Sequence, residues 1–267
     1  MKAYDFEYDQ LRLSDKGFMI CRFDSGGIDT ILNGAEITFN TVSTMRGMKH
    51  ELTSAEYEEC LTATFQICKN LCDDRNIEIS LEDTRDIMRW LNRKNFHKFR
   101  LLDDEYTGIY FEASFNVSKI EMDGKTVGFE LEMFTNRPFA LYDTVVHTIK
   151  NIKAGSTKSI FSKSDEEGYI YPDMVIEIDG DGTFEIYNDF EDRTMRIANC
   201  KRGEIITINY PLIESSLGEE RETKIQNDFN WEFFRIASTF KNRLNEFTIS
   251  LPCTIKIKYS PIIKVGI

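Results

Sequence analysis

The amino-acid sequence predicts a mainly β protein with two domains and one substantial helix. Apolar and polar residues alternate with a period of two over several stretches, which is typical of antiparallel strands with one buried and one wet face. One stretch, residues 80–93, carries its apolar residues at helical spacing instead. The length of 267 residues is enough for two ordinary domains, and a change in composition marks a boundary near residues 145–160.

Three alternating stretches form the predicted sheet of the N-terminal domain. Their apolar positions recur at every second residue over residues 61–67, 109–117 and 127–133. The dipeptide Asp123-Gly124 stands between the second and third stretches, and this pair favours a tight hairpin turn. We therefore expect an antiparallel sheet with a core on one side.

The predicted helix begins after Ser80, a good N-cap residue. Acidic residues lie in its first turns and basic residues near its end, as the helix dipole favours. We expect Trp90 and Leu91 to be structural anchors that attach the helix to the sheet, because large buried side chains contribute most to core packing. The apolar residues of the predicted stripe are Leu81, Ile87, Met88, Trp90 and Leu91.

A connection is predicted between the two domains. Residues 142–165 have little sustained amphipathicity and include Ala154-Gly155-Ser156-Thr157, and residues 148–165 of this stretch are expected to be a linker. The expected domains are then residues 1–147 and 166–267. Short predicted strands with turn signals between them favour a second all-β domain, a sandwich or jelly roll. These strands are residues 169–178, 183–188, 194–198, 204–210, 245–250 and 254–259.

Composition and charge argue against several classes of function. The chain has 33 Lys and Arg against 45 Asp and Glu, a formal net charge of −12, whereas a nucleic-acid coat or membrane-surface binder needs clustered cations. No stretch approaches the ~18 consecutive apolar residues of a membrane span, so no membrane insertion is expected. The first ten residues have no apolar core of a secretion signal. The six cysteines show no C-x2-C zinc spacing and are expected to be free thiols in a reducing cytosol.

Catalytic patterns are absent from the sequence. The three histidines lie far apart, and no nucleophile elbow, H-E-x-x-H or phosphate-binding loop is present. The segment Asp179-Gly-Asp-Gly182 lacks the rest of a calcium loop, so a hairpin turn is the favoured interpretation. Adjacent carboxylates such as Glu166-Glu167 are better explained as solvated loops than as a glycosidase pair. We therefore expect no enzymatic activity, no metal and no cofactor.

A run of aromatic residues near the C-terminal end has two interpretations. Phe229, Trp231, Phe233 and Phe234 lie close together in the sequence. Packing in the core of a sandwich is the favoured interpretation. The alternative is a platform on which sugars stack, and Trp231 is its candidate contact residue.

Several motifs follow one another in a recognisable order. One strand ends in an Asn-x-Pro-aromatic-Ala signature at residues 136–140, in which Pro138 and Phe139 are further candidate structural anchors. The other motifs are residues 89–91, 98–101, 103–106, 171–178, 196–199, 203–208 and 257–266. In this order the chain resembles the distal tail protein family of long-tailed, siphovirus-type phages of Gram-positive bacteria, or the equivalent component of a prophage or tail-like particle.

The resemblance implies a fold and a structural role. The implied fold is an N-terminal split-barrel-like β domain with one α-helix and a protruding hairpin, followed by a C-terminal galectin-like β-sandwich, a jelly roll. Six N-terminal domains would close into a ring at the distal end of the virion tail, although the isolated chain could be a monomer. The implied partners are the tail tube protein, the tail tip protein and a receptor-binding protein. Synthesis is expected in the bacterial host cytoplasm.

The implied ring gives the acidity of the chain a possible role. DNA would pass through the lumen without specific binding, and acidic walls would repel its phosphates. Ordinary solubility charge explains the same residues equally well.

Residues 26–53 are the candidate arm that closes the implied ring. This stretch has strand character but too few apolar residues to bury itself. Head-to-tail pairing with a neighbouring copy would satisfy its backbone and close by rotation. The candidate arm residues are Ile37, Phe39, Val42 and Met45.

Two other functions remain as alternatives. The C-terminal domain could be a carbohydrate-binding module that contacts sugars of the host cell wall, alone or in addition to the structural role. A jelly-roll hydrolase is the least favoured, because no acid–base pair has a spacing that suggests one.

Overall fold

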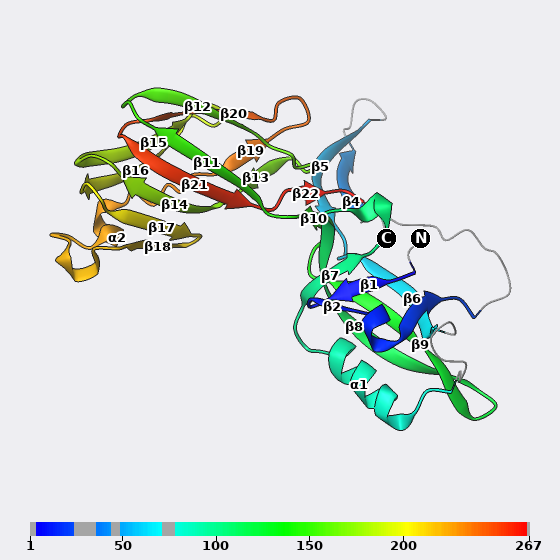
Figure 1. The fold of residues 1–267 in the computed structure, drawn as a ribbon. Helices are drawn as coiled ribbons and strands as arrows, with labels where there is room; N and C mark the ends of the chain where they lie inside the picture. Colours follow the sequence, from blue (N-terminus) through cyan, green and yellow to red (C-terminus); the bar gives the residue numbers. More distant parts are fainter. Residues whose placement is uncertain (1–3, 24–35, 44–48, 71–77, 266–267) are drawn as a thin grey trace. The chain divides into compact units, whose positions relative to one another are not determined.

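The computed structural model describes residues 4–23, 36–43, 49–70 and 78–265. The protein is mainly β and divides into two compact units, Met1–Leu141 with Ile263–Ile267, and Tyr142–Ile262. Each unit has its own hydrophobic core. Figure 1 shows the strands and the few helices of each unit.

Unit 1 is built on a nine-stranded sheet. Its main path is antiparallel throughout; β10 pairs with β8, and β22 pairs with β10. In path order the strands are β2 (Leu11–Arg12), β1 (Phe6–Tyr8), β7 (His97–Leu101), β8 (Ile109–Met122), β9 (Lys125–Thr135), β6 (Thr62–Lys69) and β3 (Phe18–Cys21), with β10 (Ala140–Tyr142) and β22 (Ile262–Ile263) beside them. Short 3-10 helices occupy Ser14–Lys16 and Asp104–Tyr106.

The alternating stretches of the sequence lie in β6, β8 and β9, as expected. Their alternate side chains, such as Ile67, Phe115 and Leu131, are almost completely buried in the core of unit 1. Asp123 and Gly124 form the two-residue turn between β8 and β9, with φ of 59° and 75°. Positive φ at both positions matches the right-handed twist of the strands, which explains the Asp-Gly pair.

Helix α1 (Leu81–Leu91) begins where the sequence predicts. The Ser80 hydroxyl accepts a hydrogen bond from the Asp83 backbone N–H at 3.0 Å, and the Asp83 carboxylate accepts one from the Ser80 N–H at 3.2 Å. This capping box satisfies two backbone donors that the helix cannot pair internally. The Trp90 ring stacks on Phe6 at 5.7 Å and its indole N–H donates to the Tyr8 carbonyl at 3.1 Å.

One member of the predicted helical stripe was placed wrongly. Leu81 is 72% exposed, whereas Thr84, Ile87, Trp90 and Leu91 are buried. With 3.6 residues per turn, Leu81 lies to one side of the stripe that these four residues define. The small Thr84 takes its place against the sheet.

Removing the cap is expected to weaken unit 1. Ser80→Ala deletes the hydroxyl acceptor and leaves the Asp83 N–H without it, which should lower the free energy of unfolding by about 1 kcal/mol. Urea denaturation monitored by tryptophan fluorescence measures this loss. Arg85→Ala, at an exposed position of the same helix outside its first turn and its capping box, is the matched control. An equal loss in both variants would show that the cap does not contribute as described.

Unit 2 contains two larger sheets that share one core. Side chains from both sheets, such as Ile176 and Ile255 on one and Phe184 and Phe247 on the other, belong to the same buried cluster, so the sheets form a sandwich. The five-stranded sheet contains β11 (Val145–Asn151), β21 (Cys253–Tyr259), β14 (Asp173–Ile178), β17 (Ile205–Asn209) and β18 (Leu212–Ser215). The four-stranded sheet contains β12 (Ser156–Phe161), β20 (Leu244–Ile249), β15 (Gly182–Asn188) and β16 (Arg193–Cys200).

Unit 2 also contains a small two-stranded sheet and two short helices. Strands β13 (Gly168–Ile170) and β19 (Ile236–Ser238) pair with each other. A 3-10 helix at Gly218–Glu220 and the short helix α2 (Ile225–Asp228) follow β18.

The predicted linker at residues 148–165 is wrong. Strand β11 pairs with β21 and β12 pairs with β20, so this segment supplies one strand to each sheet of the sandwich. Half-buried Val145, His147 and Ile149 alternate with exposed residues along β11, but the many polar residues obscure the pattern in the sequence. The units divide between Leu141 and Tyr142, and the chain returns to unit 1 at Ile263.

The segment 179–182 is not a hairpin turn. It connects β14 of the five-stranded sheet to β15 of the four-stranded sheet, and these two strands do not pair within the described sheets. A change of sheet needs the same Gly- and Asp-rich chemistry as a tight turn, so the sequence cannot distinguish them.

Candidate functional site

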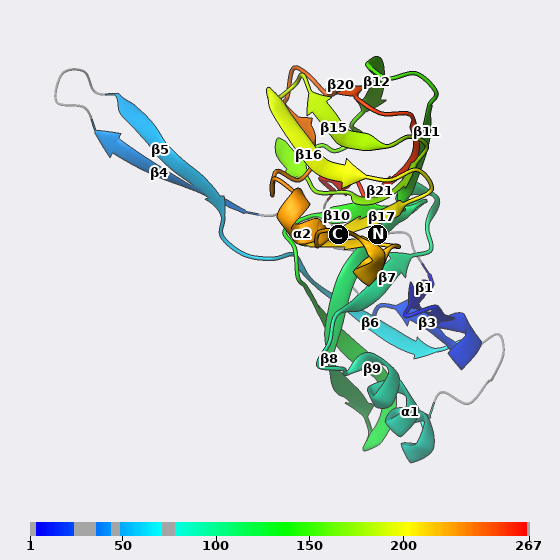
Figure 2. The same ribbon diagram turned by 90° about the vertical axis from the view of Figure 1, so that its left-hand side faces the viewer.

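A two-stranded ribbon stands apart from the nine-stranded sheet of unit 1. It consists of β4 (Ile37–Ser43) and β5 (His50–Tyr57), which pair antiparallel. Figure 2 shows this ribbon. Within the described residues, neither strand pairs with any other, so each has an unpaired outer edge. Such edges are sites at which another chain can add a strand.

The register of the ribbon separates an apolar face from a polar face. Residues that stand opposite each other in antiparallel strands project to the same side. The opposed pairs Ile37–Tyr57, Phe39–Ala55 and Thr41–Leu52 therefore form one face, which is largely apolar, and the polar pair Ser43–His50 lies at its end. The pairs Thr38–Glu56, Asn40–Ser54 and Val42–Glu51 form the other face, which is mainly polar. We call the first set the apolar face of the ribbon.

A β-bulge in β5 shifts the register, so that each face of the ribbon continues on both sides of the bulge. The register shifts between Asn40 and Thr41, which leaves Thr53 as an extra residue in β5. The Thr53 hydroxyl donates to the Asn40 carbonyl at 2.8 Å, and the Asn40 amide donates to the Ser54 hydroxyl at 3.0 Å. The polar groups of the ribbon thus find partners within it.

The apolar face lies open to water in the described structure. Phe39 is 62% exposed, Leu52 is 58% exposed and Ile37 is 39% exposed. An isolated two-stranded hairpin is at best marginally stable in water and needs packing against another surface. No other described part of the chain covers the apolar face of the ribbon.

The base of the ribbon is fixed to unit 1 by an aromatic contact. The Tyr57 ring meets the Phe139 ring edge-on at 6.3 Å, and the Lys264 ammonium lies 5.8 Å from the Tyr57 ring centre. The Glu58 N–H donates to the Glu36 carbonyl at 3.0 Å and joins the two strands at this base, which we call the root of the ribbon. Phe139 and its neighbour Pro138 are half-buried between β9 and β10. The signature at residues 136–140 thus supplies the aromatic side chain that holds the root of the ribbon.

The sequence-predicted arm residues fall into three groups. Ile37 and Phe39 lie on the apolar face, Val42 lies on the opposite face, and Met45 lies outside the described residues. Leu52, Ala55 and Tyr57 belong to the apolar face but were not singled out. Their spacing is interrupted by the extra Thr53, which hides the alternation. The predicted anchors Trp90 and Leu91 are buried in the core of unit 1.

In unit 2, Trp231 has a strained and exposed position. Its backbone φ is +60°, and its side chain is 54% exposed. The neighbouring Asn230 holds this conformation, because its side-chain oxygen accepts from the Arg196 N–H at 3.0 Å and its amide donates to the Thr194 carbonyl at 2.8 Å. Phe229, Phe233 and Phe234 are buried in the core. The three phenylalanines of the aromatic run therefore pack in the core, whereas its tryptophan is exposed to solvent.

Further aromatic rings surround the edge of Phe233. Tyr210, which is half exposed, lies 5.1 Å from Phe233, and it stacks on Tyr171 with ring centres 4.0 Å apart. The Trp231 ring lies 6.3 Å from Phe233. We call Trp231, Tyr210, Tyr171 and Phe233 the aromatic patch of unit 2.

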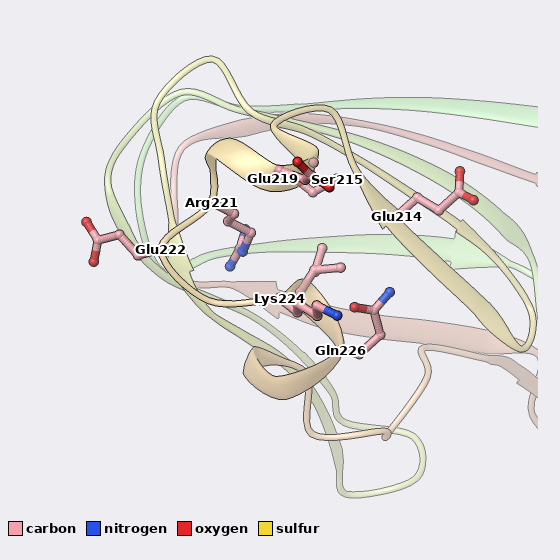
Figure 3. A pocket seen from close by; sticks show the side chains of 9 residues that line it. Glu214, Ser215, Glu219, Arg221, Glu222, Lys224 and Gln226 are labelled. Atoms are coloured by element: carbon pink, nitrogen blue, oxygen red, sulfur yellow. The ribbon is translucent and has the colours of Figure 1, made fainter.

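A hollow of about 710 Å³ lies beside α2 and the segment after β18. Figure 3 shows its side chains, with Glu222 pointing away from the other labelled side chains. Its residues are Glu214, Ser215, Gly218, Glu219, Arg221, Glu222, Lys224, Ile225 and Gln226.

The guanidinium in this hollow is engaged by buried carboxylates. Arg221 pairs with Glu204, which is completely buried, and with Asp228 at 3.0 Å. It also donates to the Ala198 carbonyl at 2.6 Å. A guanidinium that is held on three sides by the fold itself is a structural brace of unit 2.

None of the helices in the described residues has the length and apolar character needed to span a bilayer. Histidine, cysteine and carboxylate side chains do not gather there in any group of three or more that could hold a metal ion.

Comparison with known proteins places the chain in a family. A family model described as "Phage tail protein N-terminal domain" matches residues 1–137, and one described as "Phage tail C-terminal domain" matches residues 139–259. No curated protein matches the chain.

A solved structure supports the same assignment at the level of the fold. The Dit protein of phage SPP1, described as a paradigm of the hub adsorption apparatus in Gram-positive-infecting phages, is similar in fold with a TM-score of 0.66. It is 9% identical in sequence, and the match covers 97% of this chain and 99% of the SPP1 protein. The chain therefore belongs to the phage tail protein family that these two domain models describe, and it is a component of the virion tail.

Proposed function

We propose that this protein forms a hexameric ring at the distal end of the tail, in which the ribbon of each copy covers a surface of the next. The exposed apolar face of the β4–β5 ribbon is the observation that carries this proposal. The fold similarity to SPP1 Dit, a hub protein of the adsorption apparatus, supports the same role.

A ring follows from the type of contact that the ribbon makes. The ribbon and the surface that receives it are different parts of the chain, so the contact is head-to-tail. Contacts of this kind generate a closed ring when the rotation between copies closes. The Tyr57–Phe139 contact at the root fixes the direction in which the ribbon leaves unit 1. A fixed root favours a defined rotation, and hence a closed ring over an open filament.

In this proposal the protein joins the tail tube to the tail tip and to receptor-binding proteins. Unit 1 takes the role of the split-barrel-like ring domain, and unit 2 that of the galectin-like jelly roll. The role is structural and needs no catalysis. The net charge of −12 suits a channel wall that lets DNA pass without binding its phosphates.

Removing the ribbon tests the proposal. Ile37 and Tyr57 are register partners, so a short Gly-Ser link can replace residues 38–56 without stretching the chain. This variant keeps Tyr57 against Phe139. We expect a folded monomer, because the ribbon contributes no residue to the buried cluster of unit 1.

Two measurements decide the outcome. Circular dichroism reports whether the shortened chain keeps its β structure, and negative-stain imaging of the full chain and the variant reports the rings. Rings in the full chain that vanish in the folded variant support the proposal. Rings that persist without residues 38–56 contradict the role of the ribbon.

Carbohydrate binding by unit 2 is a second candidate function, and Trp231 is the residue that favours it. A left-handed backbone held by Asn230 presents the indole ring to solvent, and backbone strain of this kind concentrates at functional sites. Tyr210 adds a second exposed ring in the same patch. Exposed aromatic faces suit the C–H groups of sugar rings.

Trp231→Ala is expected to weaken glycan binding. Loss of the stacking face should weaken binding at least tenfold, or by about 1.4 kcal/mol. Glycan arrays and titration calorimetry with soluble cell-wall saccharides measure this change. Phe240→Ala is the matched control, because Phe240 is an exposed aromatic residue of unit 2 outside the aromatic patch. If the unmodified protein binds no saccharide at millimolar concentration, unit 2 has no such function.

A further inference from the structure

Two cysteines from distant parts of the chain meet on the outer face of the unit 1 sheet. In the antiparallel pair β3–β6, Cys21 stands opposite Gln66 and Cys68 stands opposite Met19. Cys21 and Cys68 are therefore diagonal neighbours on one face of the sheet. Phe18 and Ile67 point into the core, so the two thiols lie on the face away from it.

The two thiols lie close enough to interact. The Cys21 thiol hydrogen-bonds to the Cys68 sulfur, and both residues are half-buried. This hydrogen bond lowers the pKa of the Cys68 thiol to about 7, although partial burial opposes the shift. The same contact, together with burial, raises the pKa of the Cys21 thiol. The lowered pKa favours Cys68 as the attacking thiolate, which leaves Cys21 as the resolving thiol of the pair.

An aromatic ring lies beside the pair. Gly128 of β9 stands opposite Cys68, and a Cβ at this glycine would come within 2.5 Å of the Phe23 ring. The ring therefore lies directly over Gly128 on the same face of the sheet as the thiols. Glycine at this position makes room for that ring.

Two other cysteines differ from this pair in their surroundings. Cys200 and Cys253 are buried in the core of unit 2, and burial raises their pKa values to about 11 and about 12. Thiols of that kind are inert to disulfide exchange. They serve as internal controls for selective oxidation.

We propose that Cys21 and Cys68 are an oxidation site, at which a small-molecule disulfide such as glutathione disulfide converts the two thiols to an intramolecular disulfide. The site stands on the strand register and the sulfur contact, and it is independent of the proposed ring.

The reaction balances in two exchange steps. The Cys68 thiolate attacks one sulfur of glutathione disulfide, which forms a mixed disulfide and releases one glutathione thiolate. Cys21 then loses its proton, and its sulfur attacks the Cys68 sulfur and displaces the second glutathione. Two protein thiols are oxidised to one disulfide, and one glutathione disulfide is reduced to two glutathione molecules.

The position of the bond gives it a structural consequence. Strand β3 precedes the ribbon and β6 follows it, so a Cys21–Cys68 bond closes the loop of chain that carries β4 and β5. It also ties β3, at the end of the sheet path, to its neighbour β6. The reducing cytosol would keep the thiols free, and an oxidising exterior would close the bond.

Tryptic mapping of the full chain identifies the bond directly. Cleavage places Cys21 in residues 17–22, Cys60 and Cys68 in residues 50–69, and Cys72 in residues 70–75. In a Cys60→Ser background, each of these peptides holds a single cysteine. After incubation with glutathione disulfide at pH 8 and alkylation without reduction, we expect residues 17–22 linked to residues 50–69 by mass spectrometry.

Variants separate the two steps and report the effect on stability. In Cys21→Ser, the mixed disulfide with glutathione should persist at Cys68, because the resolving thiol is gone. The oxidised protein should melt several degrees higher than the reduced protein, and this difference should disappear in both Cys21→Ser and Cys68→Ser.

Three results would overturn the proposal. These are a link between residues 50–69 and 70–75, a glutathione adduct at Cys68 that persists although Cys21 is present, and full alkylation of both cysteines after oxidant treatment. Cys200 and Cys253 should react only after denaturation, which confirms that the treated protein was folded.

Discussion

Phe39→Lys is expected to abolish the ring while leaving the chain folded. Phe39 is 62% exposed in the single chain, so its replacement removes no core contact. In the ring the same side chain would be covered by the neighbouring copy, and a lysine there would bury an unpaired charge in an apolar contact. A central interface residue of this kind contributes about 2 kcal/mol or more, roughly a 30-fold change in each association constant. Sedimentation velocity should therefore show a single-chain species.

Val42→Lys is the matched control for this variant. Val42 belongs to the same strand and is also largely exposed, but it lies on the opposite, polar face of the ribbon. It should assemble like the unmodified chain. If both variants lose the ring equally, the ribbon matters through its net charge or stability and not through its apolar face. If neither does, the apolar face is not part of the contact.

Arg221→Met is expected to destabilise unit 2 by about 3–5 kcal/mol. The side chain of Glu204 is completely buried, and its charge is compensated by Arg221. Removing the guanidinium leaves the Glu204 carboxylate buried without its cation. Of its described hydrogen bonds, those from the Ser215 hydroxyl and the Lys201 N–H then remain. Asp228 also loses its ionic partner. Urea denaturation followed by far-UV circular dichroism measures the loss.

An exposed arginine of the same unit provides the comparison. Arg196 pairs with Glu185 at 3.5 Å, with about half of each side chain in solvent. Surface pairs of this kind contribute between 0 and about 1 kcal/mol, so Arg196→Met should have a small effect. Similar losses in both variants would contradict the role of Arg221 as a buried brace.

The same brace should make the unmodified protein sensitive to acid. Burial raises the pKa of Asp228, but hydrogen bonds from Thr223, Arg221 and Asn199 outweigh it and hold this pKa below its ordinary value. A carboxyl with a lowered folded-state pKa contributes stability above its unfolded pKa. That contribution is lost as the pH falls through the folded pKa. We therefore expect the stability that Asp228 provides to be complete near neutrality and to disappear in strong acid.

The strands of unit 1 were predictable because their alternation is uninterrupted. Buried apolar side chains, among them Phe111, Phe115 and Leu131, occupy every second position in the central parts of β8 and β9. The helix capped by Ser80 has an equally distinct pattern. Strand β11 was not predicted, because its apolar residues are only half-buried and alternate with polar residues such as Thr148 and Lys150, which weakens the pattern. The change of sheet at residues 179–182 could not be distinguished from a hairpin, because strand pairing is not a local property of the sequence.

The candidate sites depend on register more than on composition. The sequence indicated that the segment carrying Phe39 could not bury itself, but only the bulge at Thr53 shows which side chains share its apolar face. The exposure of Trp231 follows from its positive φ, which the hydrogen bonds of Asn230 stabilise. No local sequence pattern predicts this conformation. Cys21 and Cys68 meet because β3 pairs with β6 across the whole ribbon segment. Long-range pairing of this kind is what the sequence alone did not reveal.

Sedimentation equilibrium of the unmodified chain over a wide concentration range tests the central claim most directly. If the apolar face of each ribbon is covered by the next copy, the mass should rise with concentration from one chain to six and then stay constant, because a closed ring leaves no ribbon free. A mass of one chain at the highest concentration, or a mass that grows without limit, would contradict the ring.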